Sequence, residues 1–263
     1  MQGDSSAGKA RVVARNVVAN AALVDELDIE VDDNPCEESF VLVEESGRFE
    51  LRPPGEGQVA GIRSTFPPDL GQQRAGRPPL VRAFGKQIDR IFDLTAGLGA
   101  DAYRLAEAGH RVVAYERHPA VYAVLATGWA EACSAGRVPS EVAARLEFQH
   151  ADGARAIDRI TGPNVGVYLD PMYPQLRRKA ALPKRELQVL RRLQPELDDM
   201  GPLLAEARKR AARVVVKRSH RAPPIADDPS FEIASKLVRF DVYVNPERMQ
   251  GELADAPVDG EAE

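Results

Sequence analysis

Residues 88–116 of the chain, IDRIFDLTAGLGADAYRLAEAGHRVVAYE, contain the pattern that decides the fold. A short apolar run at Ile88–Leu94 leads into a loop with two glycines. The segment Asp101–Ala108 has the composition of a helix, and Arg111–Tyr115 is a second apolar run. Strands that alternate with helices are typical of a parallel sheet, because each crossover places a helix on a face of the sheet.

The same alternation continues toward the carboxyl terminus. We expect helices at Ala120–Ala132, Lys184–Leu193 and Leu203–Ala212, strands at Leu146–Gln149, Val165–Leu169 and Val214–Lys217, and a closing hairpin across Phe231–Val244. The sequence therefore predicts an α/β fold whose mostly parallel sheet has helices on both faces.

Three regions are expected along the chain. Residues 1–87 form an N-terminal extension, with a β-hairpin at 38–53 and a connection at 53–87 that is rich in Pro, Gly and Arg and lies outside the core. Residues 88–245 form the regular domain. Residues 246–263 are acidic and poor in large apolar side chains, which predicts a disordered tail.

Composition limits the class of protein. With 263 residues, 44% of them hydrophobic and 29% charged, the chain is long enough for a sizeable core and has ordinary globular values. Two cysteines are too few for a disulfide framework or a structural zinc site. No apolar run approaches the length of a membrane helix, and the first residues lack the apolar segment of a signal peptide. We therefore expect a cytoplasmic protein.

The net charge of −5 is unevenly distributed. Between residues 25 and 56, twelve acidic residues face two arginines, whereas residues 171–221 hold fourteen Lys and Arg against five Asp and Glu. Because salt screens charges beyond about 8–10 Å, a basic face acts locally, and the second region permits a polyanionic partner.

The loop after the first strand has the features of a nucleotide site. Gly97 and Gly99 allow a sharp turn and close approach of a ligand to the backbone, and Glu116 ends the next strand. In α/β nucleotide folds a carboxylate at that position accepts hydrogen bonds from ribose hydroxyls. The pattern Gly-x-Gly-x-x-Ala also fits a dinucleotide site, so it leaves a nicotinamide-dependent oxidoreductase open. Against that class, no Tyr-x-x-x-Lys pair is seen at Tyr173.

A second motif follows the strand Val165–Leu169. Asp170-Pro171-Met172-Tyr173 lies at the carboxyl end of this strand, where ligands bind in such sheets. The carboxylate of Asp170 and the carbonyl of Pro171 can both accept a hydrogen bond from an exocyclic amino group. Tyr173 can stack on a planar ring, which contributes about 1–3 kcal/mol in other base complexes.

With these motifs the sequence resembles class I S-adenosylmethionine-dependent methyltransferases, whose Rossmann-like domain has a seven-stranded sheet. The segments DLTAGLGADAYRLAEAGHRVVAYERHP, VYLDPMYP and RVVVKRSHRAPP resemble the RsmJ family more narrowly. That family methylates a guanine N2 in small-subunit (16S) ribosomal RNA. The resemblance covers roughly residues 75–244, and Met172 replaces the second proline usual in amino-directed enzymes.

The resemblance implies a set of site residues. Contacts to S-adenosylmethionine are expected from Asp93, Gly97, Gly99, Ala100, Asp101, Glu116, Arg117, Asp152, Gly153 and Asp170. Asp170, Pro171 and Tyr173 are the expected catalytic residues, and Arg177, Arg178, Lys179, Lys217 and Arg218 are expected to bind RNA phosphates. Asp152 is also a candidate helix N-cap.

The implied reaction is direct displacement, in which the guanine amino nitrogen attacks the methyl group. The expected partner is 16S ribosomal RNA or the small ribosomal subunit, bound by a monomer without a metal or a membrane. Three alternatives remain at this point besides the oxidoreductase: an amino-methyltransferase acting on DNA, one acting on protein, and a noncatalytic RNA-binding protein with the same fold.

Overall fold

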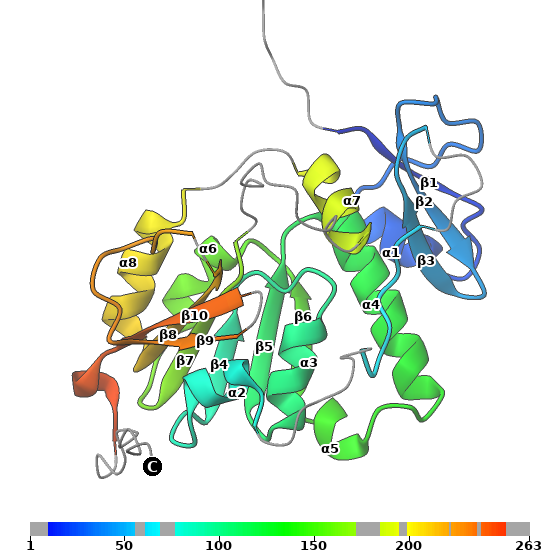
Figure 1. The fold of residues 1–263 in the computed structure, drawn as a ribbon. Helices are drawn as coiled ribbons and strands as arrows, with labels where there is room; N and C mark the ends of the chain where they lie inside the picture. Colours follow the sequence, from blue (N-terminus) through cyan, green and yellow to red (C-terminus); the bar gives the residue numbers. More distant parts are fainter. Residues whose placement is uncertain are drawn as a thin grey trace, which may run out of the picture.

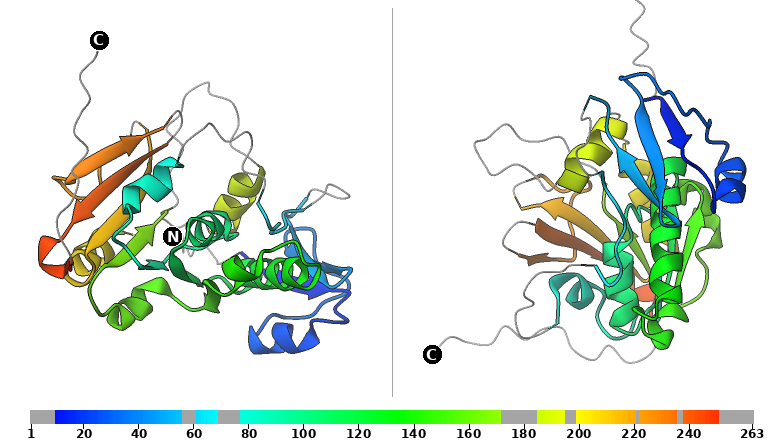
Figure 2. Two further views of the ribbon diagram at one scale, coloured as in Figure 1. Left: turned by 90° about the horizontal axis from the view of Figure 1, so that it is seen from below. Right: turned by 90° about the vertical axis from the view of Figure 1, so that its right-hand side faces the viewer.

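The computed structural model describes residues 10–55, 61–68, 77–171, 185–194, 199–220, 222–235 and 238–250. It contains a large central sheet covered by helices and a small N-terminal sheet beside it (Figure 1). Two further views show the helices on both faces of the large sheet and the small sheet packed at one side (Figure 2).

The large sheet has seven strands in the order β6-β5-β4-β7-β8-β10-β9. The five strands from β6 to β8 pair in parallel, and β10 pairs antiparallel with both β8 and β9. Their bounds are β4 Arg90–Asp93, β5 Arg111–Glu116, β6 Leu146–His150, β7 Val165–Leu169, β8 Arg213–Ser219, β9 Phe231–Ala234 and β10 Val238–Val244. The predicted α/β fold with a mostly parallel sheet is thus confirmed.

One face of this sheet packs on α2 (Pro79–Phe84), α3 (Ala100–Glu107), α4 (Pro119–Ser134) and α5 (Ser140–Ala143). The other face packs on α6 (Gly153–Ala156), the 3₁₀ turn η1 (Ile157–Arg159) and α8 (Gly201–Arg210). Because both faces are covered, every residue of β7 is buried, which explains its continuous apolar sequence. Trp129 and Tyr122 lie on α4 and pack against the core.

The N-terminal sheet contains β1 (Val12–Arg15), β2 (Phe40–Glu45) and β3 (Arg48–Arg52). The predicted hairpin is present as β2 and β3, and β1 adds a parallel strand that has no strong sequence signal. This sheet, α1 (Ala21–Glu26) and α7 (Arg185–Leu193) bury apolar side chains against the first half of α4. The extension and the larger domain therefore share a core through α4.

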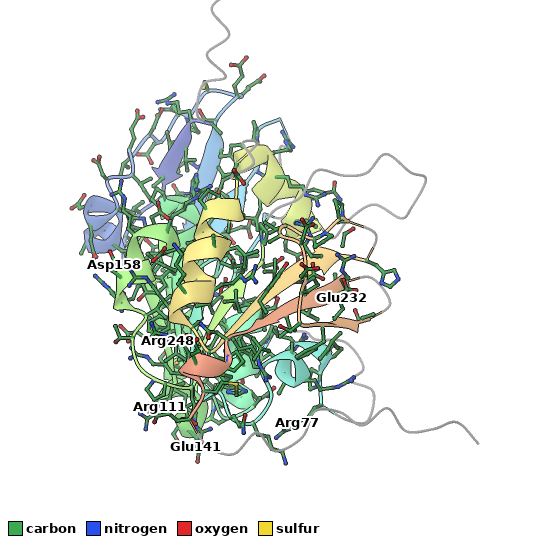
Figure 3. All side chains as sticks on the ribbon, turned by 90° about the vertical axis from the view of Figure 1, so that its left-hand side faces the viewer. Arg77, Arg111, Glu141, Asp158, Glu232 and Arg248 are labelled. Atoms are coloured by element: carbon green, nitrogen blue, oxygen red, sulfur yellow. The ribbon has the colours of Figure 1, made fainter. Side chains whose placement is uncertain are left out.

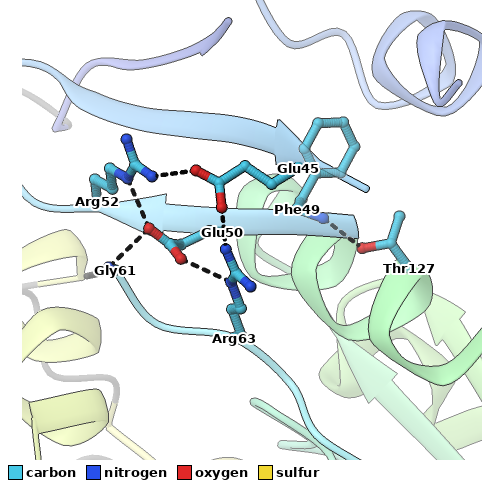
Figure 4. A network of polar contacts seen from close by, with 7 residues as sticks. All are labelled: Glu45, Phe49, Glu50, Arg52, Gly61, Arg63 and Thr127. Atoms are coloured by element: carbon cyan, nitrogen blue, oxygen red, sulfur yellow. Dashed lines mark hydrogen bonds and ion pairs between the residues drawn. The ribbon is translucent and has the colours of Figure 1, made fainter. Parts of the chain in front are cut away.

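Polar contacts join β3 to α4 and to the segment at residues 61–63 (Figure 4). The backbone N–H of Phe49 donates to Oγ1 of Thr127 on α4 at 3.0 Å. Glu50 is buried and accepts from Nε of Arg52 at 2.6 Å, from Nε of Arg63 at 2.7 Å and from the N–H of Gly61 at 2.8 Å. These partners hold the pKa of Glu50 below its ordinary value, although burial acts in the opposite direction.

The structure corrects the sequence analysis at two places. Within the connection expected to lie outside the core, α2 buries Leu80, Val81 and Phe84 under the central sheet. At the other end, residues 246–250 do not start a loose segment, because η2 (Pro246–Arg248) follows β10 and Gln250 exchanges two hydrogen bonds with Asn164. Residues 251–263 lie outside the described part of the chain.

Candidate active site

The strand order creates a crevice at the carboxyl ends of β4 and β7. From β4 the chain proceeds to β5 and β6 on one side, then crosses to β7 on the other side. Ligands of open α/β sheets bind at such a reversal point. Asp93 ends β4 and Asp170 directly follows β7, so both carboxyl groups lie at this crevice.

Thr95 connects these two acids and was not identified from the sequence. Its N–H donates to Oδ1 of Asp93 at 3.0 Å, and its Oγ1 accepts from the N–H of Asp170 at 2.7 Å. Asp93 is 1% exposed. Burial, reinforced by the nearby carboxylates of Asp101 and Asp170, raises the pKa of Asp93 to about 8. Asp93 therefore holds the loop in shape mostly as a neutral acid at pH 7.

The two glycines of the loop have different roles. Gly97 has a φ of +54°, and a Cβ placed there would meet no heavy atom within 4 Å. Gly99 has a φ of +81°, and its Cβ would lie 2.6 Å from Leu125 and 2.9 Å from Phe66. The expected close approach of a ligand thus fits Gly97, whereas at Gly99 the core on α4 excludes a side chain. Ala100 starts α3 directly after this turn.

Glu116 has a fixed orientation at the end of β5. It is buried, and its carboxylate accepts from the N–H of Gly97 at 2.9 Å and from the N–H of His118 at 2.7 Å. Burial raises the pKa of Glu116 to about 7, although both backbone groups favour its ionised form. The carboxylate therefore stands beside the open glycine, as a ribose-binding acid requires. The next residue, Arg117, is exposed and donates to Gln194 at 3.4 Å.

Asp152 and Gly153 lie at the start of α6, in the connection between β6 and β7. Asp152 is the N-cap of this helix, because its Oδ1 accepts from the N–H of Ala154 at 2.9 Å. A Cβ on Gly153 would lie 2.4 Å from the carbonyl oxygen of Leu94. Only a glycine therefore lets α6 approach the loop that follows β4.

The centre of the crevice holds one lysine between two carboxylates. Nζ of Lys217 on β8 lies 2.7 Å from Oδ2 of Asp101 and 2.7 Å from Oδ2 of Asp170. The hydroxyl of Tyr168, one residue before the end of β7, donates to Asp101 at 2.8 Å. Asp101 lies in the first turn of α3, so this cluster joins α3, β7 and β8.

The charges of this cluster influence one another strongly. Burial would raise the pKa of Asp101, but the ammonium of Lys217 and the hydrogen bond from Tyr168 hold that pKa below its ordinary value. For Asp170, burial outweighs Lys217 and the pKa is raised. The two carboxylates in turn raise the pKa of Lys217, although burial opposes this. Lys217 thus favours the ionised form of both acids, against the effect of burial.

The positions of Lys217 and Arg218 differ from the sequence analysis, which expected both to bind RNA phosphates. The ammonium of Lys217 is directed into the crevice, where two carboxylates already neutralise it. Arg218 points to the other face of the strand, is 5% exposed, and donates to the carbonyl of Pro223. Adjacent residues of a strand point to opposite faces, so the neighbouring basic residues Lys217, which is partly buried, and Arg218, which is buried, have different partners.

Pro171 is buried directly after Asp170. Tyr173, Arg177, Arg178 and Lys179 lie outside the described residues. Within the described part of the chain, no group of three His, Cys, Asp or Glu side chains is arranged to hold a metal ion, and no helix is long and apolar enough to cross a membrane.

Comparison with known proteins gives a consistent result. Residues 22–245 match the model of the SAM_MT family, described as SAM-dependent methyltransferases. The chain is 38% identical over 222 residues to Ribosomal RNA small subunit methyltransferase J of Cronobacter sakazakii, an alignment that covers 80% of this chain and 86% of that protein. It is also 38% identical over 244 residues to the protein of the same name in Alkalilimnicola ehrlichii, covering 86% and 90%.

A solved structure agrees with this similarity. The crystal structure of a SAM-dependent methyltransferase from Neisseria gonorrhoeae superposes with a TM-score of 0.67 at 28% sequence identity. The superposition covers 89% of this chain and 95% of that one.

Proposed function

The chain belongs to the family of S-adenosylmethionine (SAM)-dependent methyltransferases, and we propose that it methylates the exocyclic N2 of a guanine in small-subunit (16S) ribosomal RNA. Family membership excludes the nicotinamide-dependent oxidoreductase that the glycine pattern had left open. The observation that carries the proposal is the position of Asp170, at the crevice between β4 and β7, beside the glycine loop.

The crevice fits the cofactor. Gly97 leaves open space, and Glu116 presents a fixed carboxylate for ribose hydroxyls. Asp101, in the first turn of α3, presents a carboxylate that suits the ammonium group of a methionyl moiety. The proposed cofactor contacts are those of Asp93, Gly97, Gly99, Ala100, Asp101, Glu116, Arg117, Asp152, Gly153 and Asp170. When bound, the cofactor supplies an electrophilic methyl group on a sulfonium.

Asp170 and Pro171 are the proposed contacts of the target amino group. The amino nitrogen of guanine is a poor nucleophile, because its lone pair is delocalised into the ring. Hydrogen bonds from this amino group to the carboxylate of Asp170 and the carbonyl of Pro171 would favour a pyramidal nitrogen and direct its lone pair toward the methyl group. The amino proton becomes acidic only as the new bond forms, so a weak base such as Asp170 is sufficient to accept it.

Lys217 favours the ionised form of this acceptor. Without a neighbouring cation, a partly desolvated carboxylate binds a proton more readily and can then accept no further proton. With its Nζ at 2.7 Å from Asp170, Lys217 stabilises the negative form before transfer. We therefore assign Lys217 to the positioning of Asp170 in place of the phosphate contact expected from the sequence. Stacking by Tyr173 and phosphate contacts by Arg177, Arg178 and Lys179 remain parts of the proposal.

The substrate class rests on the relatives and on charge. The relatives named above are small-subunit ribosomal RNA methyltransferases. Residues 171–221 are strongly basic in a chain whose net charge is −5, which suits an RNA backbone. Ribosomal RNA as substrate implies action in the cytoplasm, and we propose a monomer.

The test is the transfer of a labelled methyl group from SAM to small ribosomal subunits that lack the modification. Nuclease digestion and chromatography of the nucleosides then identify the labelled product. Label in N2-methylguanosine would support the cofactor, the reaction and the target atom together. Label in another nucleoside would contradict the guanine N2 target. No label in RNA, with SAM binding measured by calorimetry, would contradict the RNA substrate and leave DNA or protein to be assayed.

A further inference from the structure

A second charged feature lies at the amino ends of the parallel strands, whereas the crevice lies at their carboxyl ends. It is an open hollow of about 600 Å³, which we call the basic hollow. Its lining contains the basic residues Arg77, Lys86, Arg90, Arg111 and Arg145, with Asp89 as the acidic residue. The labelled Arg77 and Arg111 lie at the lower end of the molecule in Figure 3.

The parallel strands bring three of these arginines into a row. Arg90 is the first residue of β4 and Arg111 the first residue of β5, and the two are register partners. Arg145 immediately precedes β6, and its carbonyl accepts from the N–H of Val112 on β5 at 2.7 Å. Neighbouring strands lie about 4.8 Å apart, so the row spans about 10 Å. Like charges directly opposite each other on paired strands are destabilising.

The five basic residues of the basic hollow form no ion pair with any described residue. Several arginines elsewhere are paired, for example Arg52 and Arg63 with Glu50, and Arg210 with Glu206, whereas others, such as Arg155 and Arg248, are single exposed charges. Burial lowers the pKa of His110, although the contact of its Nδ1 with the carbonyl oxygen of Ile88 at 2.6 Å acts in the opposite direction. The guanidinium of Arg90 also lies over the ring of Phe92, 4.6 Å from its centroid. The lining of the basic hollow therefore has five basic side chains against one acidic side chain, Asp89.

We propose that the basic hollow binds the phosphate backbone of the RNA substrate, at a place separate from the methyl-transfer crevice. This inference rests on the proposed function. Phosphate contacts position a nucleic acid without reading its sequence, and they need cations more than shaped pockets. The hollow contributes such contacts at the amino ends of β4, β5 and β6, while the crevice lies at their carboxyl ends.

The composition of the basic hollow and the length of its arginine row favour a polymer over a small anion. Pockets for small ligands are mostly apolar with few polar groups, whereas this lining is mainly charged and polar. A row of three arginines across about 10 Å matches an extended polyanion better than one phosphate ion. Along β4, Arg90 and Asp93 are about 10 Å apart, so a large structured RNA can contact both the amino and the carboxyl ends of the strands.

The experiment compares the full chain with the variants K86Q/R111Q and R90Q/R111Q/R145Q. Lys86 and Arg111 are exposed, so the first variant removes two charges without disturbing the core. The control variant, R159Q/R248Q, removes two exposed charges from η1 and η2, outside the basic region 171–221. Binding to 16S RNA is measured at several salt concentrations, together with SAM binding and methyl transfer. Binding of inorganic phosphate is measured in parallel.

We expect K86Q/R111Q to weaken RNA binding about three- to tenfold and to reduce the slope of log affinity against log salt by about 0.7 for each lost phosphate contact. The triple variant should show a larger effect, and SAM affinity should stay unchanged. RNA affinity and salt slope equal to those of the control would overturn the proposal, as would loss of phosphate binding alone. If the unaltered chain neither binds nor methylates small-subunit RNA, the proposed function fails and this inference fails with it.

Discussion

Nζ of Lys217 and Oδ2 of Asp170 lie 2.7 Å apart, which joins the end of β8 to the residue that follows β7. The lysine also contacts Asp101 at the same distance. The ammonium of Lys217 thus forms ion pairs with Asp101, in the first turn of α3, and with Asp170, directly before Pro171. A change in the charge of either acid therefore alters the pKa of the other, so Asp101 and Asp170 are electrostatically coupled through Lys217.

Replacement of Asp170 tests its role as acceptor. We expect Asp170→Ala to reduce kcat for methyl transfer by about 10²–10⁴-fold, because the amino group loses its acceptor and its orientation. SAM affinity should stay within a few-fold, since Glu116 and the glycine loop are unchanged. Single-turnover rates and calorimetry measure the two quantities.

The matched control is Asp158→Ala, which removes an exposed acid paired with Arg210 at 2.7 Å. Its activity should equal that of the unaltered protein. Methyl transfer by Asp170→Ala at a rate near that of this control would disprove the assigned role.

Lys217→Met keeps the length of the side chain and removes its charge. Since Lys217 lowers the pKa of Asp170, its loss should raise that pKa further. A higher pKa leaves more of the protonated, inactive form at pH 7. We therefore expect the acid limb of the pH profile of kcat/KM to move to higher pH, with activity recovering as the pH rises.

Lys217→Arg, which keeps a positive charge, should retain most of the original pH profile. A uniform loss of activity at every pH in Lys217→Met would contradict an electrostatic role and indicate a purely structural one. The profile therefore separates the two explanations.

Glu116 should make SAM binding dependent on pH. Its pKa of about 7 in the folded chain means that it is largely protonated at pH 6 and ionised at pH 8. The ionised form is the better acceptor for ribose hydroxyls, so SAM affinity should increase as the pH rises through 7 and then level off. Calorimetry between pH 5.5 and 8.5 measures this, and Glu116→Gln should remove the dependence.

The same residue affects stability in the opposite direction. The unfolded chain releases the Glu116 proton near pH 4.5, whereas the folded chain retains it to about pH 7. The contribution of Glu116 to the free energy of unfolding should therefore be greatest below pH 4.5 and decline between pH 4.5 and 7. Urea unfolding of Glu116→Gln should lack that decline, whatever constant loss the substitution causes.

The two loop glycines should respond differently to alanine. Gly99→Ala should lower the free energy of unfolding by about 2–5 kcal/mol, because its Cβ would overlap Leu125 and Phe66 at a positive φ. Gly97→Ala should cost only about 1 kcal/mol, since its Cβ meets open space. SAM affinity should nevertheless fall, because the new methyl group occupies the place of the ligand. Equal SAM affinity in Gly97→Ala and the unaltered chain would show that no ligand approaches there.

Much of the fold follows from local sequence patterns. The alternation of apolar runs and helical segments from Ile88 to Val244 predicted the strands, and the strand–glycine–helix–strand order placed Gly97 and Glu116 correctly. Such patterns are readable because a parallel sheet covered on both faces requires continuous apolar strands. By contrast, α2 was missed within 53–87, because its buried leucine, valine and phenylalanine stand among the Pro, Gly and Arg residues that suggested a loop.

By itself, the sequence determined the class of fold, the carboxyl-edge motifs and the family resemblance, since these depend on residue type and spacing along the chain. Only the tertiary structure decided that Lys217 bridges Asp101 and Asp170, that Arg218 is buried, and that Arg90, Arg111 and Arg145 form a row. Each of these depends on which distant strands become neighbours and in which register. The packing of the whole sheet determines which strands pair and in which register, so a local stretch of sequence does not predict it.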